Sequence, residues 1–225
     1  NPRQRSRKKY SPTTKEKDAS LRCPKRRTVE KIFSSGLVIM TDIEEKALEY
    51  LKANKQEFFK QYISDEETKT QEHKTAIFTA GTSGAGKTEY ADDRKSKEPF
   101  LLHIDIDSVR DFFTPVGYDG SNASDYQTPS SKGVNWLFDR ATKKGYSLIM
   151  DSNFSEVTIA QNNIKRLLDK EYLIEINYIY RDLHESYEFA KKRESVTKRH
   201  VPMEIVVERF KSSFDTTLFI KNIFT

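Results

Sequence analysis

Hydrophobic and polar residues follow two different periods along this chain of 225 residues. Short, nearly continuous apolar runs are typical of strands buried on both faces of a sheet. They alternate with segments in which apolar residues recur every three or four positions, as in helices. The predicted strands are residues 76–80, 100–107, 146–151 and 173–180, and the predicted helices between them include 134–144 and 156–170. This alternation predicts an α/β fold, with a parallel sheet flanked by helices on both faces.

Amphipathic helices are predicted at both ends of this core. Apolar residues at 43–62 have helical spacing, and Thr41 followed by Glu44 has the pattern of a capping box. We therefore expect one long helix that packs across the domain, and then a polar linker at 64–74. The last helix is expected to start at Pro202. Its apolar side is formed by Ile205, Val206, Phe210 and Phe214.

The first predicted strand leads directly into the sequence G-T-S-G-A-G-K-T, which is followed by a helical segment. This is the pattern of a P-loop, in which glycines let backbone N–H groups surround a polyphosphate. Lys87 is expected to reach the β- and γ-phosphates, and the Thr88 hydroxyl to bind Mg²⁺. The predicted cofactors are therefore ATP or GTP with Mg²⁺, and the sheet is expected to be P-loop NTPase-like. The expected nucleotide-binding residues are Gly81, Thr82, Ser83, Gly84, Ala85, Gly86, Lys87 and Thr88. A glycine-rich turn with a surface lysine is the alternative interpretation.

Three carboxylates lie at the ends of predicted strands, at Asp105, Asp107 and Asp151. Ligands bind beyond the carboxyl ends of parallel strands, so we expect all three near the phosphates. Asp105 and Asp107 are expected to point to different sides and to have different roles. Asp107 is the candidate general base, whereas Asp105 and Asp151 are expected near the metal. Alternatively, Asp107 is the N-cap of a helix at 108–113.

A run of cations at residues 190–202 supplies the last candidates for the site. Phosphoryl transfer spreads negative charge over the phosphate oxygens, and an arginine commonly stabilises it. Arg193 and Arg199 are the two candidates, although a solvated helix face also explains such a run. Residues 114–132 are rich in turn-forming residues and follow the candidate base, where an acceptor substrate would lie. A mobile surface loop is the alternative.

The net charge of +5 is unevenly distributed. Residues 1–31 hold twelve Lys and Arg against three acids, which leaves a net charge of −4 for the rest of the chain. Residues 1–40 are therefore predicted to be a basic, disordered tail, either an arm for an anionic partner or a solvated leader, and 41–225 the domain. The mildly acidic domain argues against nucleic acid as a partner. One cysteine indicates a reducing cytoplasm, and no apolar run is long enough for a membrane span.

The order of these motifs resembles that of the zeta toxin family of small bacterial kinases. The resemblance is carried by residues 81–88, His103 to Asp107, Leu148 to Asp151, Arg193, and Arg199 to Pro202. It implies an ATP- or GTP-dependent kinase, with UDP-N-acetylglucosamine sugars as acceptors of the best-known members. It also implies that Asp107 is the base, that Arg193 and Arg199 contact the transferring phosphate, and that a small antitoxin is a partner.

One segment departs from the family pattern. Where the family has Glu-Gly-Thr-x-Arg, residues 151–155 read Asp-Ser-Asn-Phe-Ser, so the substrate-contacting arginine is replaced by Ser155. The resemblance is therefore closer to uncharacterised relatives of the toxins than to the toxins themselves. The leading hypothesis is a kinase that phosphorylates a hydroxyl of a small metabolite, with a UDP-amino sugar as the named candidate. A polynucleotide-end kinase and a nucleotide-switched binding module are the alternatives.

Overall fold

The computed structural model describes residues 40–64 and 68–224. The predicted disordered tail at residues 1–40 lies outside them except for its last residue, so the division at residue 41 stays a prediction. Within the described part of the chain, no helix is both long and apolar enough to cross a membrane.

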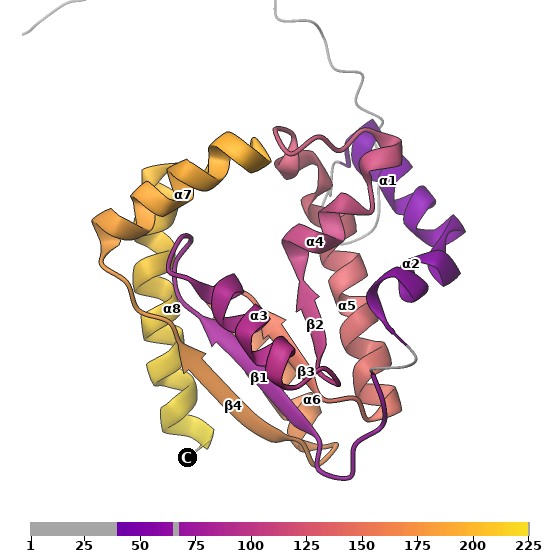
Figure 1. Ribbon diagram of the computed structural model, residues 1–225, viewed down its shortest axis with the longest axis vertical. Coiled ribbons are helices and arrows are strands. Elements are labelled where there is room, and N and C mark those ends of the chain that lie inside the picture. Colours follow the sequence, from indigo (N-terminus) through magenta and orange to yellow (C-terminus); the bar gives the residue numbers. More distant parts are fainter. Residues whose placement is uncertain (1–39, 65–67, 225) are drawn as a thin grey trace, which may run out of the picture.

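Four parallel strands form the centre of the molecule (Figure 1). They are β1 (Thr75–Ala80), β2 (Leu102–Asp105), β3 (Leu148–Asp151) and β4 (Leu173–Tyr178), in the order β2-β3-β1-β4. Asp105 and Asp151 are register partners at the ends of adjacent strands. The parallel sheet predicted from the apolar runs is therefore confirmed, and two of the candidate carboxylates lie at its carboxyl edge.

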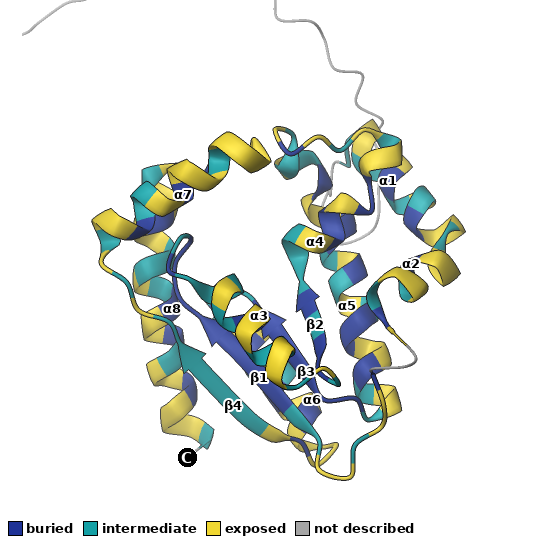
Figure 2. Cartoon of the chain, viewed as in Figure 1, coloured by how far each residue is buried: buried dark blue, intermediate teal, exposed yellow. Residues whose placement is uncertain are grey.

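Helices cover both faces of this sheet, but unequally. On one face, Ile77 and Ile149 form a small cluster with Ala91 of α3 (Lys87–Lys97). On the other, a much larger cluster includes Phe78 and Met150. It is covered by α5 (Gln127–Lys144), α6 (Val157–Leu168) and α8 (Met203–Phe224). Figure 2 shows the result, with β1 and β3 almost wholly buried and edge strand β4 less so.

The predicted N-terminal helix is two helices, α1 (Asp42–Ala53) and α2 (Lys55–Tyr62). The break falls at Asn54, whose side-chain amide donates to the carbonyl of Tyr50 over 2.9 Å and so ends the first helix. The expected capping box is present, because Thr41 and Glu44 bond each other's backbone N–H groups. Both helices lie at the α5 side of the molecule, and α1 packs on α5.

The predicted loop at 114–132 is partly helical. Two short 3₁₀ turns, η1 (Thr114–Val116) and η2 (Ala123–Tyr126), lead into α5, which starts seven residues before the predicted 134. Tyr126 is buried, and its hydroxyl donates to the Val116 carbonyl over 2.7 Å. This buried side chain ties the segment down, a tertiary contact that local turn propensity does not reveal.

Candidate active site

The P-loop connects β1 to α3 at the carboxyl edge of the sheet and is held from behind by two later helices. Gly84 has φ +78, and a Cβ there would lie 2.0 Å from the Ser186 carbonyl oxygen of α7 (Leu183–Thr197). Only glycine therefore fits both the turn and the packing. The Thr82 hydroxyl is buried and donates to the Val206 carbonyl of α8 over 2.7 Å. This predicted phosphate-binding side chain thus anchors the loop through its hydroxyl.

Lys87 folds back onto its own loop. Its Nζ donates to the Thr82 carbonyl over 2.7 Å. Burial lowers the pKa of Lys87 to about 8, and the charges of Arg193 and Arg199 act in the same direction, whereas Asp151 and Asp107 oppose it. An anionic phosphate group beside Lys87 would raise this pKa again, so the position favours an anionic ligand.

Thr88 and Asp151 form one hydrogen-bonded unit. The Thr88 hydroxyl donates to Asp151 Oδ2 over 2.8 Å, and the Thr79 hydroxyl donates to Asp151 Oδ1 over 3.0 Å. Such hydroxyl and carboxylate oxygens are the ligands that Mg²⁺ prefers. The described residues contain no group of three or more His, Cys, Asp or Glu side chains that could hold a metal ion. Mg²⁺ bound beside Thr88 and Asp151 would therefore need phosphate oxygens and water to complete its shell.

Strand β2 ends at Asp105, so the predicted strand through Asp107 is wrong. Asp107 lies in the first turn of α4 (Ile106–Asp111). The N-cap of this helix is Asp105, and not Asp107 as in the alternative prediction. The Asp105 carboxylate accepts from the backbone N–H groups of Asp107 and Ser108 over 3.1 and 2.8 Å. Side chains two residues apart in a strand point to the same face of the sheet, so Asp105 and Asp107 would have shared a face in the predicted strand. The turn into α4 is what separates the two side chains.

Asp105 is also electrostatically unusual. Burial raises its pKa, and the nearby charges of Asp107 and Asp151 raise it further. A cation placed between these carboxylates would relieve that repulsion. The metal roles assigned to Asp105 and Asp151 remain predictions.

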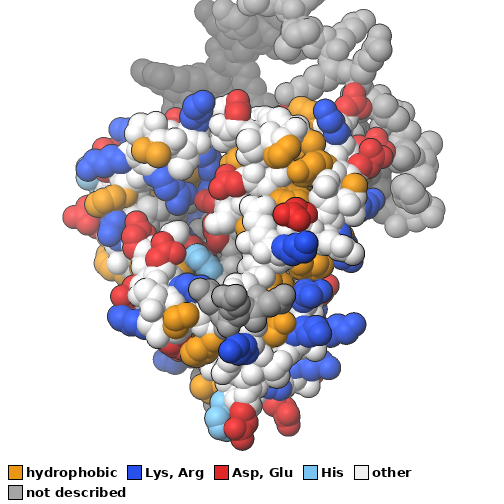
Figure 3. All heavy atoms as spheres, turned by 45° about the vertical axis from the view of Figure 1, so that its right-hand side comes forward, with side chains coloured by type: hydrophobic (Ala, Val, Ile, Leu, Met, Phe, Trp, Pro, Cys, Tyr) orange, Lys and Arg blue, Asp and Glu red, His pale blue; other side chains and the backbone are white. Residues whose placement is uncertain are grey.

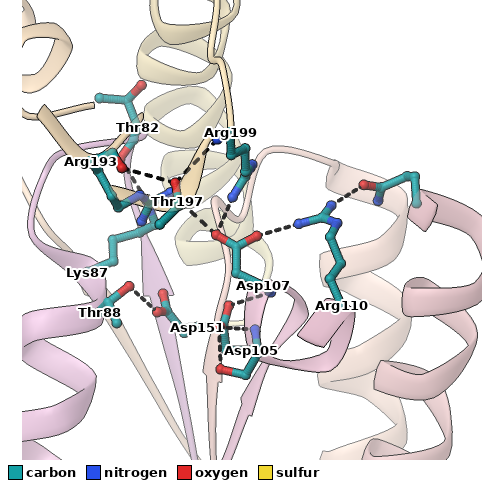
Figure 4. A network of polar contacts seen from close by, with 12 residues as sticks. Thr82, Lys87, Thr88, Asp105, Asp107, Arg110, Asp151, Arg193, Thr197 and Arg199 are labelled. Atoms are coloured by element: carbon teal, nitrogen blue, oxygen red, sulfur yellow. Dashed lines mark hydrogen bonds and ion pairs between the residues drawn. The ribbon is translucent and has the colours of Figure 1, made fainter. Parts of the chain in front are cut away.

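The Asp107 carboxylate meets three arginines (Figure 4). Its Oδ2 accepts from Arg199, and from Arg193 over 3.3 Å, while its Oδ1 accepts from Arg110. Arg193 lies in the last turns of α7, and Arg199 follows that helix, so the fold brings residues 86 and 92 positions away to the candidate base. The fold thus brings the four predicted catalytic residues around one point, and these are Lys87, Asp107, Arg193 and Arg199. Their individual roles stay predictions.

Sequence reasoning missed Arg110. Its side chain is almost fully buried, and its guanidinium joins Asp107 to the side-chain oxygen of Gln127 on α5. Arg110 is three residues from Asp107, so the two share a helix face. That spacing was the available signal, and the mistaken strand at 100–107 concealed it.

A small hollow of about 60 Å³ lies at the centre of the site, with larger hollows around it. Its lining includes residues predicted to take part in phosphoryl transfer, namely Lys87, Thr88, Asp107, Arg193 and Arg199. A hollow of about 360 Å³, lined by Gly84, Gly86 and Phe189, adjoins it on the P-loop side. Two further hollows share Arg199 with the central one and lie beyond it.

The first of these, which we call the acidic hollow, has a volume of about 420 Å³ and is lined by Asp105, Asp107, Asp111 and Asp119 together with Arg193 and Arg199. Its outer wall joins the segment after α4 to the end of α7. A Cβ on Gly120, which has φ +91, would lie 2.1 Å from the Thr197 carbonyl oxygen. Glycine thus permits the closest approach of these two walls.

The second, which we call the basic hollow, has a volume of about 500 Å³. Its charged lining residues are Arg110, Arg199, Arg209 and Glu156. Phe154, at the turn between β3 and α6, has φ +53, a strained conformation for a bulky residue. Its ring is buried against Phe78, with centroids 5.5 Å apart, which holds the turn in place. Sequence reasoning did not include Arg209.

The parallel sheet and its P-loop define the class of this protein, a nucleotide-binding protein of the P-loop NTPase type. The family model described as "Zeta toxin" matches residues 60–225, and the chain belongs to that family. This confirms the resemblance, the fold class and the enzyme class predicted from the sequence. The chain is thus a nucleotide-dependent kinase.

Several solved structures have the same fold at low sequence identity. A structure of the PezAT toxin–antitoxin system of Streptococcus pneumoniae has a TM-score of 0.62 and 18% identity, covering 81% of this chain and 76% of that one. AvrRxo1-ORF1:AvrRxo1-ORF2 with sulphate ions gives 0.58 and 15%, and the complex with ATP gives 0.57 and 14%. In both, the match covers 81% of this chain and 58% of the other. A comparison with curated proteins finds no match.

Proposed function

We propose that this kinase transfers the γ-phosphate of ATP or GTP to a hydroxyl group of a small metabolite. The observation that carries the proposal is the central hollow, where Lys87, Thr88, Asp107, Arg193 and Arg199 meet between the P-loop and two larger hollows. A phosphate at this point would have a base on one side and its nucleotide on the other.

The proposed transfer starts with an exchange of partners at Asp107. Arg193 and Arg199 contact this carboxylate, and the oxygens of a γ-phosphate would compete for both guanidinium groups. Once they turn to the phosphate, Asp107 can accept the proton of the acceptor hydroxyl. The hydroxyl oxygen then bonds to the γ-phosphorus, the bond to the β–γ bridging oxygen breaks, and the nucleoside diphosphate leaves.

Lys87 and the two arginines would stabilise the charge that develops on the transferring group. Thr88 would hold Mg²⁺, and Asp151 would orient its water shell, since these two side chains already share a hydrogen bond of 2.8 Å. When bound, Mg²⁺ would neutralise charge on the β- and γ-phosphate oxygens. Arg110 would keep Asp107 in position from the buried side.

A UDP-amino sugar is the first acceptor to test, and a small antitoxin that covers the site is the proposed protein partner. The structural relative PezAT is a toxin–antitoxin system, and AvrRxo1-ORF1:AvrRxo1-ORF2 has been solved with ATP. A polynucleotide end is less suited, because acidic and basic side chains are interspersed on the face in Figure 3, and a nucleic-acid groove needs concentrated positive charge.

The test is incubation with γ-labelled ATP and Mg²⁺ against nucleotide sugars, nucleic-acid ends and cell extract, followed by mass spectrometry of the labelled product. We expect one labelled small molecule, which disappears with Lys87→Ala. Slow nucleotide hydrolysis with no labelled acceptor would instead favour a nucleotide-switched binding module. Label on nucleic acid alone would favour the end kinase.

A further inference from the structure

We propose that Phe189 on α7 stacks against the nucleobase of the phosphate donor, in the hollow beside the P-loop, and that this stacking admits adenine and guanine alike. The inference rests on the proposed function, which it deepens by naming the class of donor: purine nucleoside triphosphates, with weak selection between ATP and GTP. Phe189 is then a binding residue of the nucleotide site and takes no part in the transfer itself.

The position of Phe189 beside the P-loop is the first observation. Helix α7 lies against the loop between β1 and α3 (Figure 1), and a Cβ on Gly84 would lie 2.0 Å from the Ser186 carbonyl oxygen and 3.0 Å from the Ala190 nitrogen. Phe189, next to Ala190, is 46% exposed. The hollow of about 360 Å³ on this side, which we call the P-loop hollow, is lined by Gly84, Gly86, Lys87, Thr88, Glu89, Phe189, Lys192 and Arg193. An aromatic ring is thus left uncovered beside a phosphate-binding loop.

The P-loop hollow connects to the point of transfer, which is the second observation. It shares Lys87, Thr88 and Arg193 with the central hollow, so a triphosphate can extend from one into the other. Phe189 lies four residues before Arg193, so the two side chains share a face of α7. Four residues of helix span about 6 Å. The ring is therefore placed behind the transferring phosphate, toward the nucleoside.

Two cations contact the ring, and they are held differently. The Arg181 guanidinium carbon lies 4.1 Å from the ring centroid, and its Nη1 donates to the Gly84 carbonyl over 3.0 Å, which fixes the ring relative to the loop. Lys192 is exposed, and its Nζ lies 5.2 Å from the same centroid. A cation–π contact at an exposed site is weak, so a phosphate of the nucleotide would draw this ammonium group away. The side of the ring that Lys192 leaves is then open to a base.

The lining of the P-loop hollow favours stacking over recognition of the base edge. Strong discrimination between bases needs buried donors and acceptors that lose their partners when the wrong base binds. Among the described residues that line this hollow, Glu89 and Lys192 carry charge away from the point of transfer, and both are exposed to water. Every base, in contrast, has a face that can stack on an aromatic ring. Similar affinities for ATP and GTP follow.

The direct test measures, by calorimetry with Mg²⁺, the binding of non-hydrolysable ATP and GTP analogues and of inorganic tripolyphosphate, which has the phosphates but no base. We expect Phe189→Ala to weaken binding of both analogues about tenfold while leaving tripolyphosphate affinity unchanged. Phe189→Tyr keeps the aromatic face and should stay within about threefold of the wild type, whereas Phe189→Leu, which is apolar without a ring, should not. Phe219→Ala is the matched control, because Phe219 is also 46% exposed but lies on α8, outside the lining of the P-loop hollow.

Equal affinity of wild type and Phe189→Ala for the ATP analogue would overturn the proposal, as would an equal loss with Phe219→Ala. An equal loss of tripolyphosphate affinity would also overturn it, because the ring would then act on the loop and not on the base. A preference of the wild type for one analogue by more than about tenfold would show that a base edge is recognised, against the proposal.

Thermal unfolding of each variant shows whether a loss reflects misfolding. In that case, or where tripolyphosphate binds the wild type too weakly to measure, the contrast between Phe189→Tyr and Phe189→Leu decides. The kinase function is judged separately by labelled transfer. Transfer from ATP with unchanged KM for ATP in Phe189→Ala would refute the role of Phe189 alone. Phe189-dependent nucleotide binding without transfer to any acceptor would refute the proposed transfer alone.

Discussion

The two sides of the central hollow are built in different ways. On the nucleotide side, the P-loop is one continuous segment, residues 81–88, in which the turn and its packing are fixed mainly by backbone and glycine. The proposed acceptor side is assembled from side chains of α4, the turn after β3, the segment after α7, and α8. This difference indicates which part of the site depends on distant elements. The P-loop is specified by one short segment, whereas the other side depends on side chains that the fold brings together from distant positions, as the contact between Arg209 and Ser155 illustrates.

Asp107 lies on the boundary between these sides, so its substitution is expected to have the largest effect. Asp107→Asn keeps the size of the side chain but removes the proton acceptor, and kcat should fall about 10³-fold. Nucleotide affinity should stay within about tenfold of the wild-type value, because Lys87 and the P-loop are unchanged. Single-turnover transfer and binding of an ATP analogue would measure the two separately. Transfer at the wild-type rate in Asp107→Asn would exclude Asp107 as the base.

Arg110 tests whether the acceptor side needs its buried support. Arg110→Lys keeps a positive charge but cannot bond Asp107 and Gln127 together as the planar guanidinium does. We expect kcat to fall about tenfold with little change in the KM for ATP. Steady-state kinetics with Lys132→Met as an exposed control would show this. A larger effect on the KM for ATP than on kcat would place Arg110 on the nucleotide side.

The same contrast explains what could be predicted from the sequence. The P-loop and the four strands follow from local patterns, and the parallel sheet follows from the alternation of strands with helices. Arg193 and Arg199 could be predicted because they lie in a run of cations, and the P-loop earlier in the chain indicated a phosphate for those cations to contact. Arg209 was not found, since its relation to Ser155 depends on how α8 crosses the turn after β3. A long-range contact of this kind leaves no periodic signal.

Lys87 allows the nucleotide side to be tested by pH. Its pKa of about 8 lies below the ordinary value of 10.5, so the side chain is charged below pH 8 and loses its charge as pH rises further. ATP affinity should therefore be constant below about pH 7.5 and about tenfold weaker near pH 9, with a proton taken up on binding. Calorimetry in buffers of different ionisation enthalpy would detect that proton.

Lys87→Arg is the matching control, because arginine stays charged throughout this range. Its ATP affinity should lack the decline above pH 8, whatever its absolute value. A decline of the same size in Lys87→Arg would mean that another group causes it.

Gly120 is expected to give the smallest effect, and it sharpens the choice between the two hollows. Gly120→Ala would force the wall of the acidic hollow away from the Thr197 carbonyl, which a Cβ would approach to 2.1 Å. Gly117→Ala is the matched control, since Gly117 also has a positive φ, of +105, but only the Tyr126 hydroxyl lies near, at 3.2 Å. If the acceptor binds in the basic hollow, the KM for acceptor should change less than about threefold in both variants, even where thermal stability falls by about 1–3 kcal/mol. A tenfold rise in that KM for Gly120→Ala alone would move the acceptor to the acidic hollow, because only that hollow has Gly120 in its wall.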